Sequence, residues 1–161
     1  MLQVITICSI ALLIVLDQLI KLLVLKYLAP VGSFPLIGGF IQLNYAENTG
    51  AAFGFFSGFT VILSVITFCV IAVGIFLLLS KKIKFGVEYV CAVAIIAGGT
   101  GNLIDRVFRG FVIDYIEPLF IDFAIFNFAD ILVTCGAAVL IFWILFDTFR
   151  GRKKLEQEKN E

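Results

Sequence analysis

The sequence predicts an all-α integral membrane protein with four transmembrane helices and a small β-sheet at the outer, extracytoplasmic interface. Of its 161 residues, 61% are hydrophobic and only 15% are charged, whereas an average soluble domain is about 25% charged. The mean hydropathy is correspondingly high, at +1.11. Four apolar runs are each long enough to form a bilayer-spanning helix, which needs about 20 residues.

The four runs define a single membrane domain over residues 1–161. The two longest connections, 27–58 and 107–127, precede the second and the fourth span, and a polar tail follows at 149–161. We place the spans near residues 4–26, 59–80, 87–106 and 128–148.

The basic residues near the span ends predict the orientation, because cytoplasmic loops carry an excess of lysine and arginine. Lys81, Lys82 and Lys84 lie between the second and third spans, and a basic run, 150–154, follows the fourth. Both segments lie on one side of a four-span protein, so we expect that side, with both chain termini, to be cytoplasmic. The long connections 27–58 and 107–127 then face outward.

The first outer connection has the composition of a strand and a turn. Residues 40–45 are rich in β-forming residues, and Asn48-Thr49-Gly50 is a turn signal. Bare strand edges do not occur within hydrocarbon, so we place a small sheet at the outer interface. Four aromatic residues beside it are expected to anchor in the lipid boundary: Phe53, Phe55, Phe56 and Phe59.

The third span is rich in small residues. The pairs Ala94/Gly98 and Ala97/Gly101 each stand four residues apart. This spacing lets transmembrane helices approach closely. We therefore expect the third span to pack tightly against a neighbour.

The composition narrows the possible chemistry. Acidic and basic residues balance at twelve each, which does not indicate a nucleic-acid partner. The chain has no histidine, the commonest metal ligand and general base. Its four cysteines stand singly in separate apolar runs, so no metal or other cofactor is predicted. Carboxylates are the main remaining candidates for catalysis.

Charged residues inside the first and third spans need partners, because charge is expensive in a bilayer. Asp17 and Lys21 share a helix face on the first span. An intrahelical ion pair, with Lys21 reaching the outer interface, and a role in an active site both stay open. Asn102, Asp105 and Arg106 share a face of the third span, where the two adjacent charges need other partners. For Asp105 and Arg106 we favour a structural role over direct catalysis.

Asp114 and Asp130 are the candidate catalytic pair. Asp114 lies just past the third span and Asp130 at the mouth of the fourth, with Asn127 on the same face. Two adjacent carboxylates share one proton, which leaves one acid and one base to activate water against a peptide carbonyl. Two alternatives stay open: Asp130 caps the fourth helix, or Asp114 pairs with an arginine, Arg106 or Arg109. We expect the remaining loop acids to be solvated: Glu117 and Asp122.

Five stretches, in this order and with this spacing, resemble the lipoprotein signal peptidases, the type II signal peptidases of bacteria. The resemblance covers nearly the whole chain apart from the tail. The stretches are Asp17-Gln18-Leu19-Ile20-Lys21, Asn48-Thr49-Gly50-Ala51-Ala52-Phe53, Gly98-Gly99-Thr100-Gly101-Asn102-Leu103-Ile104-Asp105-Arg106, Val112-Ile113-Asp114-Tyr115 and Phe126-Asn127-Phe128-Ala129-Asp130.

The resemblance implies an intramembrane aspartic endopeptidase of the bacterial cytoplasmic membrane. Its substrate would be a prolipoprotein with a diacylglyceryl cysteine, cleaved just before that cysteine at the outer face of the membrane. Asp114 and Asp130 fall on the family's catalytic pair. Other matched residues line, order or support the site, namely Asn48, Asn102, Arg106, Asn127, Asp17 and Asp105, with Lys21 in the first motif. A self-contained site in four spans fits a monomer surrounded by membrane lipid.

Two other classes of protein also place acids in spans. A proton- or ion-conducting transporter would line a path across the membrane with them, but the second span carries no charge from 59 to 80. A structural subunit of a membrane complex would account for the small residues of the third span. It would leave the five polar stretches unexplained.

Overall fold

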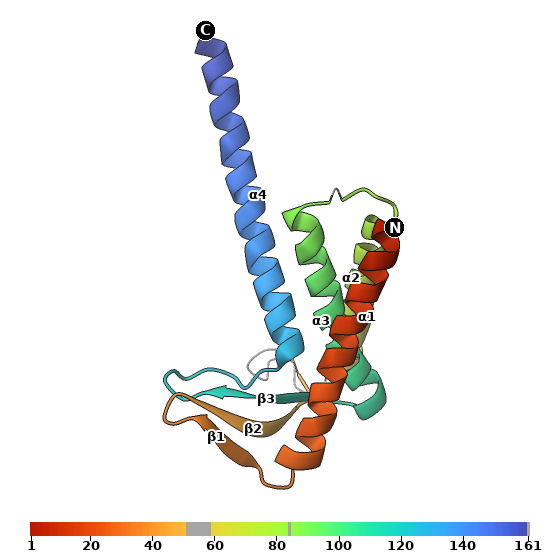
Figure 1. The fold of residues 1–161 in the computed structure, drawn as a ribbon, viewed down its shortest axis with the longest axis vertical. Coiled ribbons are helices and arrows are strands. Elements are labelled where there is room, and N and C mark those ends of the chain that lie inside the picture. Colours follow the sequence, from red (N-terminus) through yellow and green to blue (C-terminus); the bar gives the residue numbers. More distant parts are fainter. Residues whose placement is uncertain (51–58, 84, 161) are drawn as a thin grey trace.

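Four long helices form the body of the molecule (Figure 1). The structure, a computed structural model, describes residues 1–50, 59–83 and 85–160, with side chains as far as 150. The helices are α1 (Leu2–Leu23), α2 (Thr60–Leu79), α3 (Val87–Arg109) and α4 (Phe128–Asn160). Each is long and apolar enough to cross a membrane, so the predicted spans are confirmed. The helix α4 continues beyond the expected end of its span, into the polar tail.

A three-stranded antiparallel sheet closes the end of the bundle opposite both termini (Figure 1). Its strands are β1 (Ser33–Ile37), β2 (Ile41–Asn48) and β3 (Val112–Pro118), in the order β1-β2-β3. The β-forming residues 40–45 predicted β2, whereas β1 and β3 were not predicted, and β3 lies in the expected loop 107–127. A signal for β3 was available, because Gly110 ends α3 in a left-handed conformation and a stretch rich in β-forming residues follows it.

The turn after β2 is also confirmed. The Asn48 side chain accepts a hydrogen bond from the Gly50 amide at 2.9 Å, which is the local pattern of an Asx turn. Three of the expected lipid anchors, Phe53, Phe55 and Phe56, lie outside the described residues.

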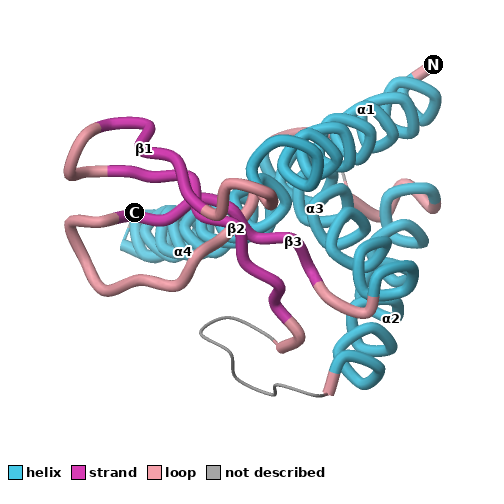
Figure 2. Tube along the Cα trace, turned by 90° about the horizontal axis from the view of Figure 1, so that it is seen from below, coloured by secondary structure: helices cyan, strands magenta, loops and turns pink. Residues whose placement is uncertain are grey.

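The helix α3 is central and packs against α1, α2 and α4. In the view from below, the strands run across the bundle end, and α2 lies on the side away from β1 (Figure 2). A methyl group added at Gly98 would lie 2.4 Å from the Ala129 carbonyl oxygen, and one at Gly101 would lie 2.5 Å from Asp17 Oδ2. The small residues therefore let α1 and α4 approach α3 as closely as the spacing predicted.

The burial pattern reverses that of a soluble protein. The outward faces of the helices carry exposed apolar residues such as Val61 and Phe68, as expected where lipid replaces water. Several of the largest fully buried side chains are instead polar or charged: Lys21, Asn127, Asp17 and Asp105. Polar groups buried in an apolar medium must form hydrogen bonds with one another. The hydrogen bonds of these buried residues therefore identify the functional site.

The end of α1 is shaped to meet the sheet. A single π-helical segment, η1 (Val24–Leu28), continues α1. Its buried Val24 and Leu28 pack in one cluster with Ile113 and Tyr115 of β3. Such π-type turns are often found at functional sites. This one packs the end of α1 against β3, the strand that carries Asp114.

Candidate active site

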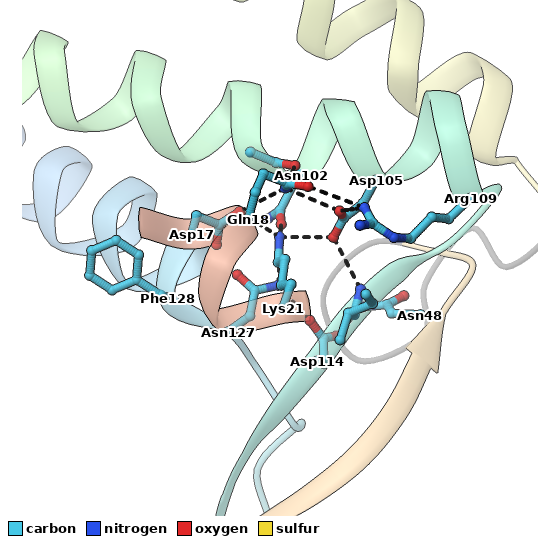
Figure 3. Close-up of polar contacts among 12 residues, drawn as sticks. Asp17, Gln18, Lys21, Asn48, Asn102, Asp105, Arg109, Asp114, Asn127 and Phe128 are labelled. Carbon is cyan, nitrogen blue, oxygen red and sulfur yellow. Dashed lines mark hydrogen bonds and ion pairs between the residues drawn. The ribbon is translucent and has the colours of Figure 1, made fainter. Parts of the chain in front are cut away.

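Lys21 is the centre of a buried ion network (Figure 3). Its ammonium lies 2.9 Å from Asp17 Oδ2 and 2.9 Å from Asp105 Oδ2, and it donates to Asn102 Oδ1 at 2.8 Å. The predicted ion pair with Asp17 is confirmed. The expectation that Lys21 reaches the outer interface is wrong, because its side chain is fully buried. Three oxygens satisfy its three donors and so replace water.

Arg109 and Gln18 complete this network, although neither was predicted as a site residue. Arg109 pairs with Asp105 Oδ1 and donates to Gln18 Oε1 at 3.2 Å. Gln18 donates in turn to the Asp105 carboxylate at 3.2 Å and to the Gly101 carbonyl at 3.1 Å. The i, i+4 spacing of Asp105 and Arg109 was the available signal. Two carboxylates, one lysine and one arginine make the cluster formally neutral, which suits a low-dielectric site.

Asn102 connects the ion network to Asp130. Its Oδ1 accepts from Lys21, and its Nδ2 donates to Asp130 Oδ1 at 2.7 Å. An amide has one donor end and one acceptor end. An ammonium can only donate, so Lys21 determines that the Asn102 amino group faces Asp130.

Asp114 is 2% exposed, and two amides hold its carboxylate. Asn127 Nδ2 donates to Oδ1 at 2.6 Å, and Asn48 Nδ2 donates to Oδ2 at 2.9 Å. Burial, and then the negative charge of Asp130, raise the pKa of Asp114 to about 6. An influence of Asp130 on Asp114 is what the predicted pairing of the two acids leads us to expect.

The alternative arginine partners of Asp114 are engaged elsewhere. Arg109 pairs with Asp105, and Arg106 donates to the Gly50 carbonyl at 3.0 Å. Within the described part of the chain, Asp114 forms no ion pair with either arginine.

Asp130 and Asn127 cap α4 reciprocally. The Asp130 amide donates to Asn127 Oδ1 at 2.9 Å, and the Asn127 amide donates to Asp130 Oδ2 at 3.1 Å. This is the geometry of a capping box. The interpretation of Asp130 as a helix cap is therefore correct, but capping does not exclude an active-site role. The same arrangement places Asn127 Nδ2 on Asp114 and Asp130 Oδ1 on Asn102.

The two carboxylates open onto one cavity of about 320 Å³. One part of its wall is polar, with Asn48, Asn102 and Arg106 beside the two acids. The remainder is mostly apolar and comes from the 123–126 segment and from α4. A largely apolar pocket with a few convergent polar groups is typical of a binding site. Arg106 Nε is buried beside it without an acceptor among the described residues.

The described residues contain no group of three or more histidine, cysteine or acidic side chains placed to hold a metal ion. The chemistry available to the site is that of two carboxylates among amide and guanidinium donors. Such a pair can act as general acid and general base toward water.

Comparison with known proteins identifies the family. The family described as "Signal peptidase (SPase) II" matches residues 9–146. The chain belongs to the signal peptidase II family. This match confirms the predicted resemblance and the predicted enzyme class, a signal peptidase, and it disfavours the transporter and the structural subunit.

Members of the signal peptidase II family resemble the chain over nearly their full length. A protein from Caldanaerobacter subterraneus subsp. tengcongensis, named "Lipoprotein signal peptidase", is 43% identical and aligns over 85% of this chain and 93% of its own. One of the same name from Clostridioides difficile is 39% identical over 89% and 96%. A solved bacterial membrane enzyme is 31% identical, with a TM-score of 0.79 over 89% of this chain and 88% of its own.

The structure brings every predicted site residue into one connected region. Asn48, Asn102 and Asn127 touch the two acids directly, and Arg106 lines their cavity. Asp17, Lys21 and Asp105 lie behind Asn102. Glu117 differs from the expectation of a solvated acid, because it accepts hydrogen bonds from Asn44, at 2.8 Å, and from Gln42. Glu117 therefore links β3 to β2. These hydrogen bonds could be predicted only from the register of the two strands.

Proposed function

We propose that this member of the signal peptidase II family cleaves prolipoproteins with Asp114 and Asp130 as its catalytic pair. The carrying observation is that Asn127 and Asn102 bind both carboxylates into one hydrogen-bonded cluster that opens onto the cavity. The charge of Asp130 is also among the causes that raise the pKa of Asp114, and two carboxylates coupled in this way share one proton. One acid and one base are therefore present together at the cavity wall.

The surroundings of the two acids suggest their roles. Asp130 lies in the first turn of α4 and accepts from the Asn127 amide and the Asn102 side chain, and a helix N-terminus favours negative charge. Asp114 lies on a strand with a pKa raised to about 6. We therefore assign the carboxylate to Asp130 and the shared proton to Asp114.

Hydrolysis then proceeds in two steps. Asp130 takes a proton from a water molecule as the water oxygen attacks the scissile carbonyl carbon, while protonated Asp114 donates a hydrogen bond to the forming oxyanion. As the carbon–nitrogen bond breaks, Asp130 passes the proton that it took from water to the leaving amine. The products are the signal-peptide carboxylate and the free α-amino group of the cysteine. Arg106 lines the cavity, and its Nε has no acceptor among the described residues, so we assign it the role of orienting the peptide.

The substrate we propose is a prolipoprotein whose cysteine carries diacylglycerol, cut just before that cysteine. The apolar part of the cavity wall suits the hydrophobic signal segment and the lipid. A diacyl anchor holds the scissile bond at one depth, which reduces its search in space. The sheet, whose strand β3 carries Asp114, lies at the end opposite both termini (Figure 1), so termini on the cytoplasmic side would leave the site facing outward. All residues of the proposed site come from one chain, which supports a monomer in lipid.

The deciding experiment is a cleavage assay with purified protein and a prolipoprotein substrate, with and without a chelator. Asp114→Asn and Asp130→Asn should each lower kcat by about 1,000-fold or more, as loss of a residue that acts within a catalytic unit does elsewhere. Asp147→Asn, on the exposed far part of α4, is the matched control and should cleave normally. Wild-type turnover by either dyad variant, in folded protein, would remove the pair from the mechanism.

A further inference from the structure

Tyr115 connects β3, the strand that carries Asp114, to the start of α4, the helix that carries Asp130. It follows Asp114 on β3, and neighbouring strand residues point to opposite faces. Tyr115 is 5% exposed and packs with Val24 and Leu28 of η1, in the cluster that supports β3 from α1. Its ring is therefore held firmly on the face of β3 away from the cavity.

The hydroxyl of Tyr115 reaches the first residue of α4. It accepts a hydrogen bond from the Phe128 amide at 3.1 Å. The first amides of a helix have no partner within the helix. In α4, the Asn127 side chain satisfies the Asp130 amide, and Tyr115 satisfies the Phe128 amide.

The backbone strengthens the same connection. The amides of Tyr115 and Ile116 donate to the Phe126 carbonyl at 3.1 and 2.8 Å, and the Phe126 amide donates to the Ile116 carbonyl at 3.0 Å. Main chain and side chain together thus fasten β3, with Asp114, to the start of α4, with Asp130. Of these hydrogen bonds, the one to the Tyr115 hydroxyl can be removed by deleting a single oxygen atom.

We propose that Tyr115 is a positioning residue that sets the separation of the Asp114 and Asp130 carboxylates through its hydrogen bond to the Phe128 amide. This inference rests on the proposed function. Without that bond, the backbone hydrogen bonds of Phe126 and the Asn127–Asp114 hydrogen bond still join α4 to β3. The Phe128 amide, however, loses its partner, so the first turn of α4 can shift relative to β3 and widen the pair. A wider pair shares its proton less tightly, so its upper apparent pKa falls.

Tyr115 itself does not titrate in the working range. Burial, followed by the charges of Asp17, Asp130 and Asp114, raises its pKa to about 12. The other charges acting on the dyad are Lys21 on α1 and Arg106 on α3. Removal of the hydroxyl changes none of these charges, so a shifted pH profile would report the geometry of the pair.

The test compares Tyr115→Phe with Tyr45→Phe in the full chain. The probe is a synthetic signal-peptide segment with a diacylglyceryl cysteine. Both substitutions delete one hydroxyl on the same sheet. The Tyr45 hydroxyl donates a hydrogen bond to Glu47, two residues along its own strand, at 2.8 Å. For Tyr115→Phe we expect kcat to fall about three- to tenfold, with KM changed less than twofold, since small misplacements of catalytic groups lower the rate steeply. The alkaline limb of its kcat profile should move to lower pH, and Tyr45→Phe should match wild type.

A second substitution keeps the test decisive if Tyr115→Phe does not fold. Site-specific 3-fluorotyrosine at position 115 keeps the ring and the oxygen but weakens the oxygen as an acceptor. It should shift kcat and the alkaline limb in the same direction by less. A lowered melting temperature with wild-type kcat and pH limbs would overturn the proposal. Asp114→Asn, assayed in parallel, tests the proposed function separately, because its activity decides the dyad whatever Tyr115 does.

Discussion

At the scale of single residues, the molecule is organised by the need to satisfy polar groups buried within a membrane protein. Lys21 illustrates this need, because its fully buried ammonium has three oxygen partners from α1 and α3. Removing one partner of a buried ion pair leaves an uncompensated charge, which costs more than the pair contributes. The network therefore fixes the positions of the Asn102 and Asp105 side chains, and the loss of any one charged member should destabilise the fold.

Replacing Lys21 tests this network. Lys21→Met should lower the free energy of unfolding by about 3–5 kcal/mol, because Asp17 and Asp105 would face each other without the cation. Lys26→Met, which removes an exposed lysine of η1, the segment that continues α1, should have little effect. Adding Asp17→Asn to Lys21→Met should restore part of the loss, measured by denaturation in detergent micelles. Equal stability of all three proteins would contradict the network.

The hydrogen bond from Asn48 predicts a pH effect. It favours the charged form of Asp114 and so lowers that pKa against the raising effects of burial and Asp130. Asn48→Ala should raise the pKa of Asp114 above its value of about 6. The pair would then keep its proton to higher pH, and the alkaline limb of kcat/KM should move upward, opposite to the shift expected for Tyr115→Phe.

The control for Asn48→Ala is Asn44→Ala on the same strand. Asn44 donates to Glu117 and does not contact the dyad. The pH limbs of Asn44→Ala should coincide with those of wild type. A downward shift for Asn48→Ala would show that its amide does not stabilise the Asp114 carboxylate.

At the scale of elements, the close approach of α3 and α4 sets where Asp130 lies. Gly98 faces the Ala129 carbonyl, one residue before Asp130, with no room for a methyl group. Gly99, its neighbour, faces Ile71 of α2 at an ordinary contact distance of 3.5 Å. Adjacent positions of one helix therefore differ sharply in their tolerance of a side chain.

We expect Gly98→Ala to push the start of α4 away from α3. A misplacement of about 1 Å can lower a catalytic rate by about 100-fold, so cleavage should fall far more than the amount of inserted protein. Gly99→Ala adds the same methyl group and should cleave at the wild-type rate. Equal activity of the two variants, measured at matched protein levels, would contradict the assigned role of the α3–α4 contact.

At the scale of the whole molecule, function depends on which side of the membrane the sheet occupies. The sheet, with Asp114 on its strand β3, lies at one end, and both termini and the α2–α3 connection lie at the other (Figure 1). The basic residues beside that connection predict that it is cytoplasmic. The active site would then meet its substrate on the outer side.

Cysteine labelling tests this orientation. In a chain whose four native cysteines are replaced by alanine, Gly38→Cys marks the β1–β2 turn and Ser80→Cys marks the end of α2. A membrane-impermeant maleimide should label position 38 in intact cells and position 80 only after the cells are permeabilised. The reverse pattern would invert the topology and place the site in the cytoplasm.

Much of the fold and the site could be predicted because their signals are local. Runs of about 20 apolar residues indicated the four spans, and the glycine spacing of the third predicted its close packing. The polar stretches around Asp114 and Asp130 stood out against an apolar background. The pairing of β3 with β2, and the hydrogen bonds that Glu117 accepts from β2, could not be predicted, because they depend on the register of the two strands.

The sequence by itself determined the membrane class, the four spans, the family resemblance and the residues that gather at the site. Only the tertiary structure decided which atoms meet: the three oxygens on Lys21, the amide of Asn127 on Asp114, the hydroxyl of Tyr115 on α4. Hydropathy and spacing are properties of neighbouring residues. Hydrogen bonds between elements depend on distances of a few tenths of an ångström between residues up to 91 positions apart, and those distances exist only once the helices have packed.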